Sequence, residues 1–135
     1  MATASNLRIV LVTPETTLVD ELVESLRFPL YDGQIGILPG RAPLVGRLGY
    51  GELQITTTGT TKSYFVDGGF VQVKQGVVSL LTNRAQLAGN LDPKQAEDEL
   101  QAAQQERPGT DADFARKERD LIRARRKLAL ARKTR

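Results

Sequence analysis

The sequence has no cysteine and no histidine among its 135 residues. Without cysteine there is neither a disulfide framework nor a thiolate metal site, which fits a reducing compartment. Without histidine, Ser-His and Cys-His catalytic pairs are excluded, and so are imidazole-ligated metals. Catalysis would have to rely on carboxylates, lysine, tyrosine or serine. We therefore expect a non-catalytic protein that carries neither a cofactor nor a metal.

Long apolar segments are missing as well. No run approaches the roughly 20 residues that a helix needs to span a bilayer. The first residues, Met1 to Asn6, lack a basic segment followed by an apolar core, so they do not resemble a signal peptide. We expect a soluble protein that meets a membrane only through a partner.

The charge is distributed unevenly along the chain. The formal net charge is +3, but residues 116–135 hold ten Lys/Arg and two Asp/Glu, a net charge of +8. The other 115 residues carry nine basic and fourteen acidic groups, a net charge of −5. A mildly acidic body with a strongly basic tail indicates an anionic partner for the tail.

Residues 7 to about 88 have the pattern of a β-domain. Apolar and polar residues alternate with a period of two in several segments, beginning with Leu7 to Val12. Turns are expected at Gly59 and at Gln75-Gly76, and a turn or bulge at Asp67-Gly68-Gly69. Many short strands with a turn every 8–12 residues predict a sandwich or a flattened barrel.

The pattern changes to helical spacing after Gly89-Asn90. Asp92 and Pro93 are suited to the N-cap and first position of a helix that Arg107-Pro108-Gly109 would end. Thr110 or Asp111 would cap a second helix. Its expected apolar face consists of Phe114, Leu121, Ile122 and Leu128. Both apolar stripes are thin, so we expect an antiparallel hairpin that rests on the β-domain or on a partner.

Two possible catalytic or nucleotide sites are not supported by their spacing. The glycines between Gly33 and Gly40 match neither a Walker A loop nor a dinucleotide fingerprint, and they indicate turns. Nothing in the sequence brings two of Asp32, Glu52 and Asp67 together as an acid/base pair. We interpret these three carboxylates as solvated surface groups.

The basic tail leaves several partners open. Basic residues near a helix C-terminus oppose the helix dipole, but this accounts for only two or three of the ten. Nucleic acid, anionic lipid and an acidic protein segment remain possible. The tail has no aromatic residue to stack on bases, which weakens the single-strand interpretation. One function is therefore a β-sandwich binding module with a basic helical tail for nucleic acid or anionic membrane.

The most specific segment runs from Asp32 to Leu44, with the sequence DGQIGILPGRAPL. It resembles the signature loop of the F-type ATP synthase epsilon family, called delta in mitochondria. Three further segments fit in order: Val10 to Pro14 resembles the opening strand, Val66 to Val73 the Gly-Gly hairpin, and Leu91 to Ala96 the start of the first C-terminal helix. The resemblance covers essentially the whole chain.

The resemblance implies a mainly β fold with an α appendage: an N-terminal ten-stranded β-sandwich, then a two-helix antiparallel hairpin. Residues 1–88 would form the domain that binds the stalk and the c-ring, and residues 89–135 a regulatory hairpin. The implied function is a non-catalytic rotor subunit that couples the gamma subunit to the c-ring and inhibits ATP hydrolysis. Such a subunit is peripheral, on the cytoplasmic face of a bacterial inner membrane or the stromal face of a thylakoid, and binds no nucleic acid.

The resemblance also assigns contact residues. The family's c-ring contacts correspond to Gln34, Arg41 and Ala42. Arg41 stands where the family usually has histidine, so a donor is kept but its charge becomes permanent. Pro39 and Pro43 limit backbone freedom on either side and stiffen the loop.

The regulatory contacts implied by the family lie in the second helix. In the family, the extended helices approach the catalytic beta and alpha subunits and contact an acidic segment on beta. The basic residues that we expect to make this inhibitory contact are Arg123, Arg125, Arg126 and Lys127.

Some bacterial members of the family bind ATP through an Ile/Leu-Asp-x-x-Arg-Ala motif. The corresponding segment here is Leu91 to Ala96, with Gln95 in place of the arginine. A charge-assisted contact is therefore missing, and such contacts are roughly twice as strong as neutral ones. We predict weak or absent ATP binding.

Overall fold

The computed structural model describes residues 7–134. The expectation about a signal peptide at Met1 to Asn6, and the tail residue Arg135, lie outside that range. The strands are β1 (Leu7–Val12), β2 (Thr17–Val23), β3 (Ser25–Leu30), β4 (Gly33–Ile37), β5 (Leu44–Thr57), β6 (Thr60–Lys74), β7 (Val77–Leu81) and β8 (Ala85–Leu87). A short 3-10 helix, η2 (Ala88–Asn90), leads to helices α1 (Pro93–Gln105) and α2 (Asp111–Lys133). The expected mainly β fold with an α appendage is confirmed.

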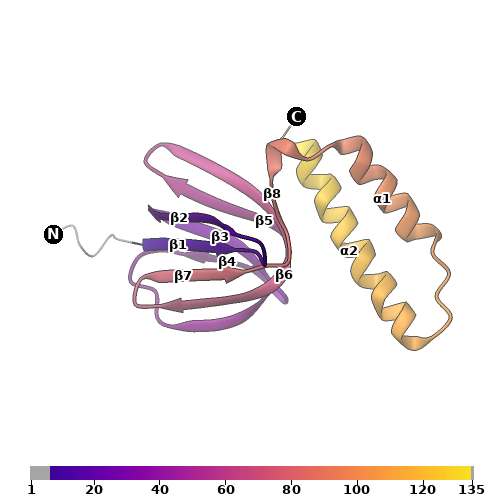
Figure 1. Cartoon of the computed structure of the whole chain (residues 1–135), viewed down its shortest axis with the longest axis horizontal. Helices are drawn as coiled ribbons and strands as arrows, with labels where there is room; N and C mark the ends of the chain where they lie inside the picture. The colour runs from indigo at the N-terminus through magenta and orange to yellow at the C-terminus, as the bar shows by residue number, and fades with distance from the viewer. Residues whose placement is uncertain (1–6, 135) are drawn as a thin grey trace.

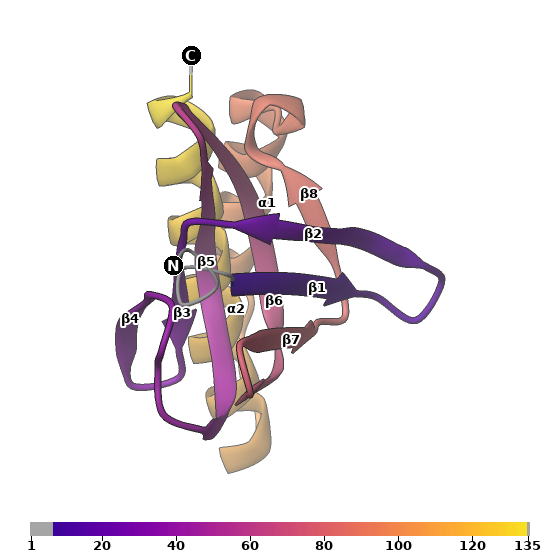
Figure 2. The same cartoon turned by 90° about the vertical axis from the view of Figure 1, so that its left-hand side faces the viewer.

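The strands pair in the order β2-β1-β7-β6-β5-β3-β4, and β8 pairs with β6. All pairs are antiparallel except β1 with β7. Within residues 7–134 there are eight strands, so the expected number of ten is wrong. β5 and β6 are long, with 14 and 15 residues, and β6 pairs with β8 over its first part and with β7 over its last part. Counting the two halves of β5 and of β6 as separate strands gives ten. Figure 2 shows β1, β2 and β7 lying across β5 and β6.

The core lies between the layers and follows the period of two. In β1, Leu7, Ile9 and Leu11 are buried while Arg8 is exposed. Burying each such side chain contributes about 1.5–3 kcal/mol. The main cluster of buried residues comes from β1, β2, β3, β4, β5, β6 and β7. One core therefore holds both layers together.

The segment Asp67-Gly68-Gly69 is a bend within β6 and not a turn or a register-shifting bulge. Leu48 pairs with Gly69 and Tyr50 with Asp67, so the register with β5 is the same on both sides. Gly68 and Gly69 have φ of 70° and 120°, values that favour glycine. The bend lets β6 change its other partner from β8 to β7.

The helix boundaries agree with the expected caps. The Asp92 carboxylate accepts from the Lys94 amide at 3.0 Å, and Pro93 opens α1. Thr110 Oγ1 accepts from the Asp113 amide at 3.1 Å, so Thr110 is the N-cap of α2. No helix among the described residues is long and apolar enough to cross a membrane.

The expected apolar face of α2 is partly wrong. Phe114 is 60% exposed because it lies in the first turn of α2, next to the loop, where α1 has already ended. The buried residues of α2 are Ala124, Leu128, Leu130 and Ala131. Alanines therefore carry much of the contact with α1, whose own buried residues are Ala96 and Ala103.

The two helices form an antiparallel pair beside the sandwich, with α2 nearer to the strands (Figure 1). Leu130 and Ala131 of α2 pack with Phe65 of β6, with Ala88 of η2 and with Leu91. This second apolar cluster is small, so polar contacts have a large part in holding α2 on the sandwich.

Candidate functional site

The segment between β4 and β5, residues 38–43, forms a stiff turn on the surface. The Arg41 amide donates to the Leu38 carbonyl at 3.3 Å, and Gly40 has a φ of 86°. Pro39 followed by a glycine with positive φ defines a type II β-turn. The turn leaves Leu38, Arg41 and Ala42 exposed. An apolar side chain and a cation are therefore presented on one short, rigid loop.

Gln34 lies near the start of β4, opposite Pro29 of β3, and it is exposed. At about 3.3 Å per residue, roughly 13 Å of backbone separates it from Leu38, the first residue of the turn. The chain then turns and enters β5 at Leu44, and Gly33 of β4 and Leu48 of β5 both pair with Leu30 of β3. Arg41 and Ala42 are adjacent in the turn, whereas Gln34 belongs to the preceding strand.

The outer face of the layer formed by β5, β6, β7 and β1 carries exposed apolar side chains. Phe70 pairs with Arg47 on one side and with Leu81 on the other, so the three form a row across the sheet. Phe70 is 60% and Leu81 54% exposed, and Val45 is exposed two residues from Arg47. Val45 lies beside this row, on the same strand as Arg47, and we call the apolar residues Val45, Phe70 and Leu81 the apolar row. Exposed apolar side chains that gather on one face of a sheet make that face a candidate for a protein contact.

Arg123, in the middle of α2, is bound to the sandwich. Its Nε lies 2.8 Å from Asp67 Oδ1, at the bend of β6, and its guanidinium lies 5.0 Å from the centre of the Tyr50 ring. A third contact, 3.0 Å to Asp120, stays within the helix. Asp67 and Arg123 are only 16% and 37% exposed. Partial burial lowers the pKa of Arg123, but Asp67 outweighs it and raises the pKa above its usual value.

The other three expected inhibitory residues differ in their surroundings. Arg126 donates to the Tyr50 carbonyl at 2.9 Å, and Lys127 pairs with Glu99 of α1 at 3.1 Å. Arg125 is exposed and makes no ion pair or hydrogen bond within residues 7–134. Only one of the four is therefore free to meet a partner without first losing an internal contact.

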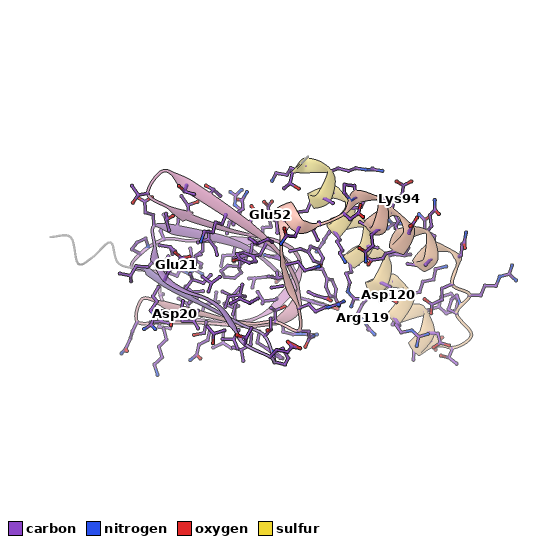
Figure 3. All side chains as sticks on the ribbon, turned by 45° about the horizontal axis from the view of Figure 1, so that its top comes forward. Asp20, Glu21, Glu52, Lys94, Arg119 and Asp120 are labelled. Atoms are coloured by element: carbon purple, nitrogen blue, oxygen red, sulfur yellow. The ribbon has the colours of Figure 1, made fainter. Side chains whose placement is uncertain are left out.

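Glu52 of β5 forms a second link between the sandwich and α2. Its carboxylate accepts from Lys133 at 2.8 Å and from Ser63 at 2.7 Å. Partial burial raises the pKa of Glu52, but the hydrogen bonds from Lys133, Ser63 and Gln54 outweigh it and leave the pKa below its usual value. In Figure 3, Glu52 lies at the side of the sandwich that faces α2, whereas Asp20 and Glu21 lie away from the helices.

These contacts correct the interpretation of the carboxylates. Asp32 is exposed, as expected of a solvated group, but Glu52 and Asp67 are half-buried partners of the tail. Sequence reasoning missed both as functional candidates. The opposite net charges of the body and the tail were the only signal that could have indicated them.

A cleft of about 370 Å³ lies between the two helices and the strands β6 and β8. Its charged lining residues are Asp67, Glu99, Glu106, Asp120, Arg84, Arg123 and Lys127. Carboxylates outnumber cations there, and Gln95 is exposed on α1, outside this lining. Four carboxylates against three cations give this lining a small net negative charge, which disfavours a polyphosphate.

Comparisons with known proteins agree with this architecture. Residues 6–88 match the family model of the ATP synthase delta/epsilon chain β-sandwich domain. The ATP synthase epsilon chain of Rhodopirellula baltica is 46% identical over 91 residues, 67% of this chain and 71% of its own. That of Solibacter usitatus is 36% identical over 127 residues, 93% of this chain and 95% of its own.

Solved structures share the fold at lower identity. A chain in the Euglena gracilis mitochondrial ATP synthase assembly of OSCP, F1 and c-ring has a TM-score of 0.83 at 22% identity, covering 93% of this chain and 81% of its own. A chain in the central stalk and c-ring of the Tetrahymena thermophila mitochondrial enzyme has a TM-score of 0.73 at 15% identity, covering 93% and 96%. The family match over the sandwich and the relative that spans both sandwich and helices lead to one conclusion: this chain belongs to the ATP synthase delta/epsilon chain family.

Proposed function

We propose that this chain is a non-catalytic central-stalk subunit of an ATP synthase, which couples the gamma subunit to the c-ring and restrains ATP hydrolysis through α1 and α2. The observation that carries the proposal is the combination of a rigid sandwich, an exposed stiff turn and a lightly docked helical pair in a chain of this family. The membrane association is through the complex, on the cytoplasmic face of a bacterial membrane or the stromal face of a thylakoid.

The ring contact is assigned to Gln34, Arg41 and Ala42. The type II turn supports this assignment, because transmission of torque needs a contact that does not yield, and Pro39 and Gly40 fix its backbone. The permanent charge of Arg41 makes the contact insensitive to pH in the range where a histidine would titrate.

The contact with the gamma subunit is assigned to the apolar row, Val45, Phe70 and Leu81. These side chains are too exposed to serve the core, and they project from strands whose other face is buried. A protein partner that covers them would gain about 25 cal/mol for each Å² of apolar surface removed from water.

The contact that inhibits ATP hydrolysis, here called the brake, is assigned to Arg123, Arg125, Arg126 and Lys127. These residues would bind an acidic segment of a beta subunit, close to a neighbouring alpha subunit. Arg125 is the cleanest probe, since it has no internal partner among residues 7–134. Replacing Arg123 or Lys127 would also disturb the docked hairpin. Arg119, on the same helix, is likewise exposed and makes no ion pair or hydrogen bond among those residues, so it is the matched control.

The test uses a synthase from which the epsilon chain has been removed. Adding the wild-type chain should restore the complex in a pull-down and suppress ATP hydrolysis, with weaker suppression as salt rises. Replacing all four basic residues with alanine should preserve assembly but release hydrolysis. Arg125→Ala should release part of it and Arg119→Ala little. Full suppression by the quadruple variant would mean that the hairpin blocks sterically and that its charge is not the brake.

The runner-up function, a module for nucleic acid or anionic membrane, makes a different prediction. Such a protein would be retained on a polyanion column and released by salt, and would not co-purify with alpha, beta and gamma subunits. Co-purification with those subunits would favour the stalk function. Most cations of the tail already have partners within the chain, which leaves few of them free to bind a polyanion.

A further inference from the structure

Two carboxylates of the sandwich meet two cations of α2 at separate points along the helix. Asp67 binds Arg123 at 2.8 Å, and Glu52 binds Lys133 at 2.8 Å. Both carboxylates are 16% exposed, but Arg123 is 37% and Lys133 is 58% exposed, so water screens the pair of Asp67 with Arg123 less than the pair of Glu52 with Lys133. Among residues 7–134, the buried apolar side chains of α2 in the cluster beside these pairs are Leu130 and Ala131.

The position of Asp67 depends on the bend in β6. Its amide donates to Thr82 Oγ1 and to the Arg84 carbonyl, both at 3.2 Å, which fixes the backbone at that point. The positive φ of Gly68, the next residue, gives the bend its shape. The backbone that carries this carboxylate is thus fixed by contacts within the sandwich, independently of α2.

We propose that Asp67 and Glu52 act as an internal acidic receptor that holds α2 on the sandwich and competes with any acidic partner for the same cations. The inference rests on the proposed function, because a brake must leave the sandwich before it can reach the catalytic subunits. It adds to that function a competition between two partners for one side chain. Arg123 cannot bind Asp67 and an external carboxylate cluster at full strength at the same time.

Asp120 provides a control within the same cluster. Its carboxylate also binds Arg123, at 3.0 Å, but both residues belong to α2, so this pair does not connect the helix to the sandwich. The receptor therefore predicts that Asp67→Asn releases the hairpin while Asp120→Asn does not. Both changes keep the size of the side chain and remove one charge.

The experiment measures docking in the isolated full chain. Because the chain has no cysteine, fluorophores can be attached at Thr58→Cys, in the turn after β5, and at Gln101→Cys, on α1. Energy transfer between them reports the ratio of released to docked hairpin. Asp67→Asn should raise that ratio on the order of tenfold, the loss of one half-buried charged hydrogen bond. Asp120→Asn should leave it within about twofold.

Charge reversal separates the receptor from a general loss of stability. Asp67→Lys and Arg123→Glu should each release the hairpin, and the double variant should restore docking. Equal ratios for wild type, Asp67→Asn and Asp120→Asn, or no restoration by the double variant, would overturn the receptor.

A second arm tests the link to the proposed function. In the reconstituted synthase, Asp67→Asn should deepen the inhibition of ATP hydrolysis, because Arg123 is freed for the head. If Asp67→Asn releases the hairpin in the isolated chain but hydrolysis stays as in wild type, the receptor stands and the brake is wrong.

Discussion

Gly69→Ala should destabilise the sandwich more than any other single methyl group added to a described glycine. A Cβ at this position would collide with the Leu81 carbonyl oxygen and would lie 2.9 Å from Thr82 Cα. Both are backbone atoms of the neighbouring segment, so no side chain can rotate to relieve the clash. The φ of 120° adds a cost of about 1–3 kcal/mol for a residue other than glycine. Separating the Phe70–Leu81 pair adds to this, and we expect a total of at least about 4 kcal/mol.

Gly59→Ala is the matched control. Gly59 also has a positive φ, 71°, but a Cβ there meets nothing within 4 Å. The control therefore carries only the backbone cost of about 1–2 kcal/mol. Urea unfolding followed by circular dichroism gives both free energies of unfolding. Since a domain of this size has about 5–15 kcal/mol in total, the two variants should be clearly separated. Equal midpoints would show that β7 moves aside cheaply and would refute the steric reasoning.

Three further outcomes are expected. Truncation after Asn90 should leave a folded sandwich that still binds the gamma subunit. The truncated protein should be less stable than the full chain because Phe65 no longer packs against Leu130. A product that is unfolded in circular dichroism would contradict the division at residue 88. In the wild type, the ion pair of Glu52 with Lys133 should stabilise docking at pH values above the usual Glu pKa of 4.5. This contribution should be lost as the pH falls through the lowered pKa of Glu52 in the docked chain. A pH titration of the energy transfer should show that loss as a step, and Lys133→Ala should make the step smaller. ATP should bind weakly or not at all, since Gln95 replaces the arginine and the cleft is rich in carboxylates; micromolar affinity in calorimetry would contradict this.

The fold could be predicted largely from local pattern. Period-two alternation identified β1, and the Asp92-Pro93 pair identified the start of α1. The strand number could not be predicted in the same way, because whether β5 is one strand or two depends on pairings with β3 and β6 across the sandwich. Long-range pairing decides it, and no local signal encodes that.

The candidate contact residues also fall into some that the local sequence predicts and others that it does not. The turn with Arg41 and Ala42 could be predicted because proline and glycine fix a turn within four residues. The roles of Glu52 and Asp67 could not, since each is an isolated carboxylate in sequence and finds its cation more than fifty residues away. Phe114 was misplaced because a helical face says which residues point the same way, but not where the partner helix ends.

Under the proposed function, exchange of partners would explain how the hairpin can have two states of similar free energy. In the proposed released state, Arg123 gives up Asp67 and Lys133 gives up Glu52, and the acidic segment of the partner would replace Asp67 as the partner of Arg123. The charged contacts then largely cancel between the two states, and the difference reduces to the apolar cluster around Leu130 and to the carboxylates left behind. That cluster is small, so a difference of a few kcal/mol is expected, and a modest change in either partner can move the population. A larger apolar interface on α2 would have fixed the hairpin in one place.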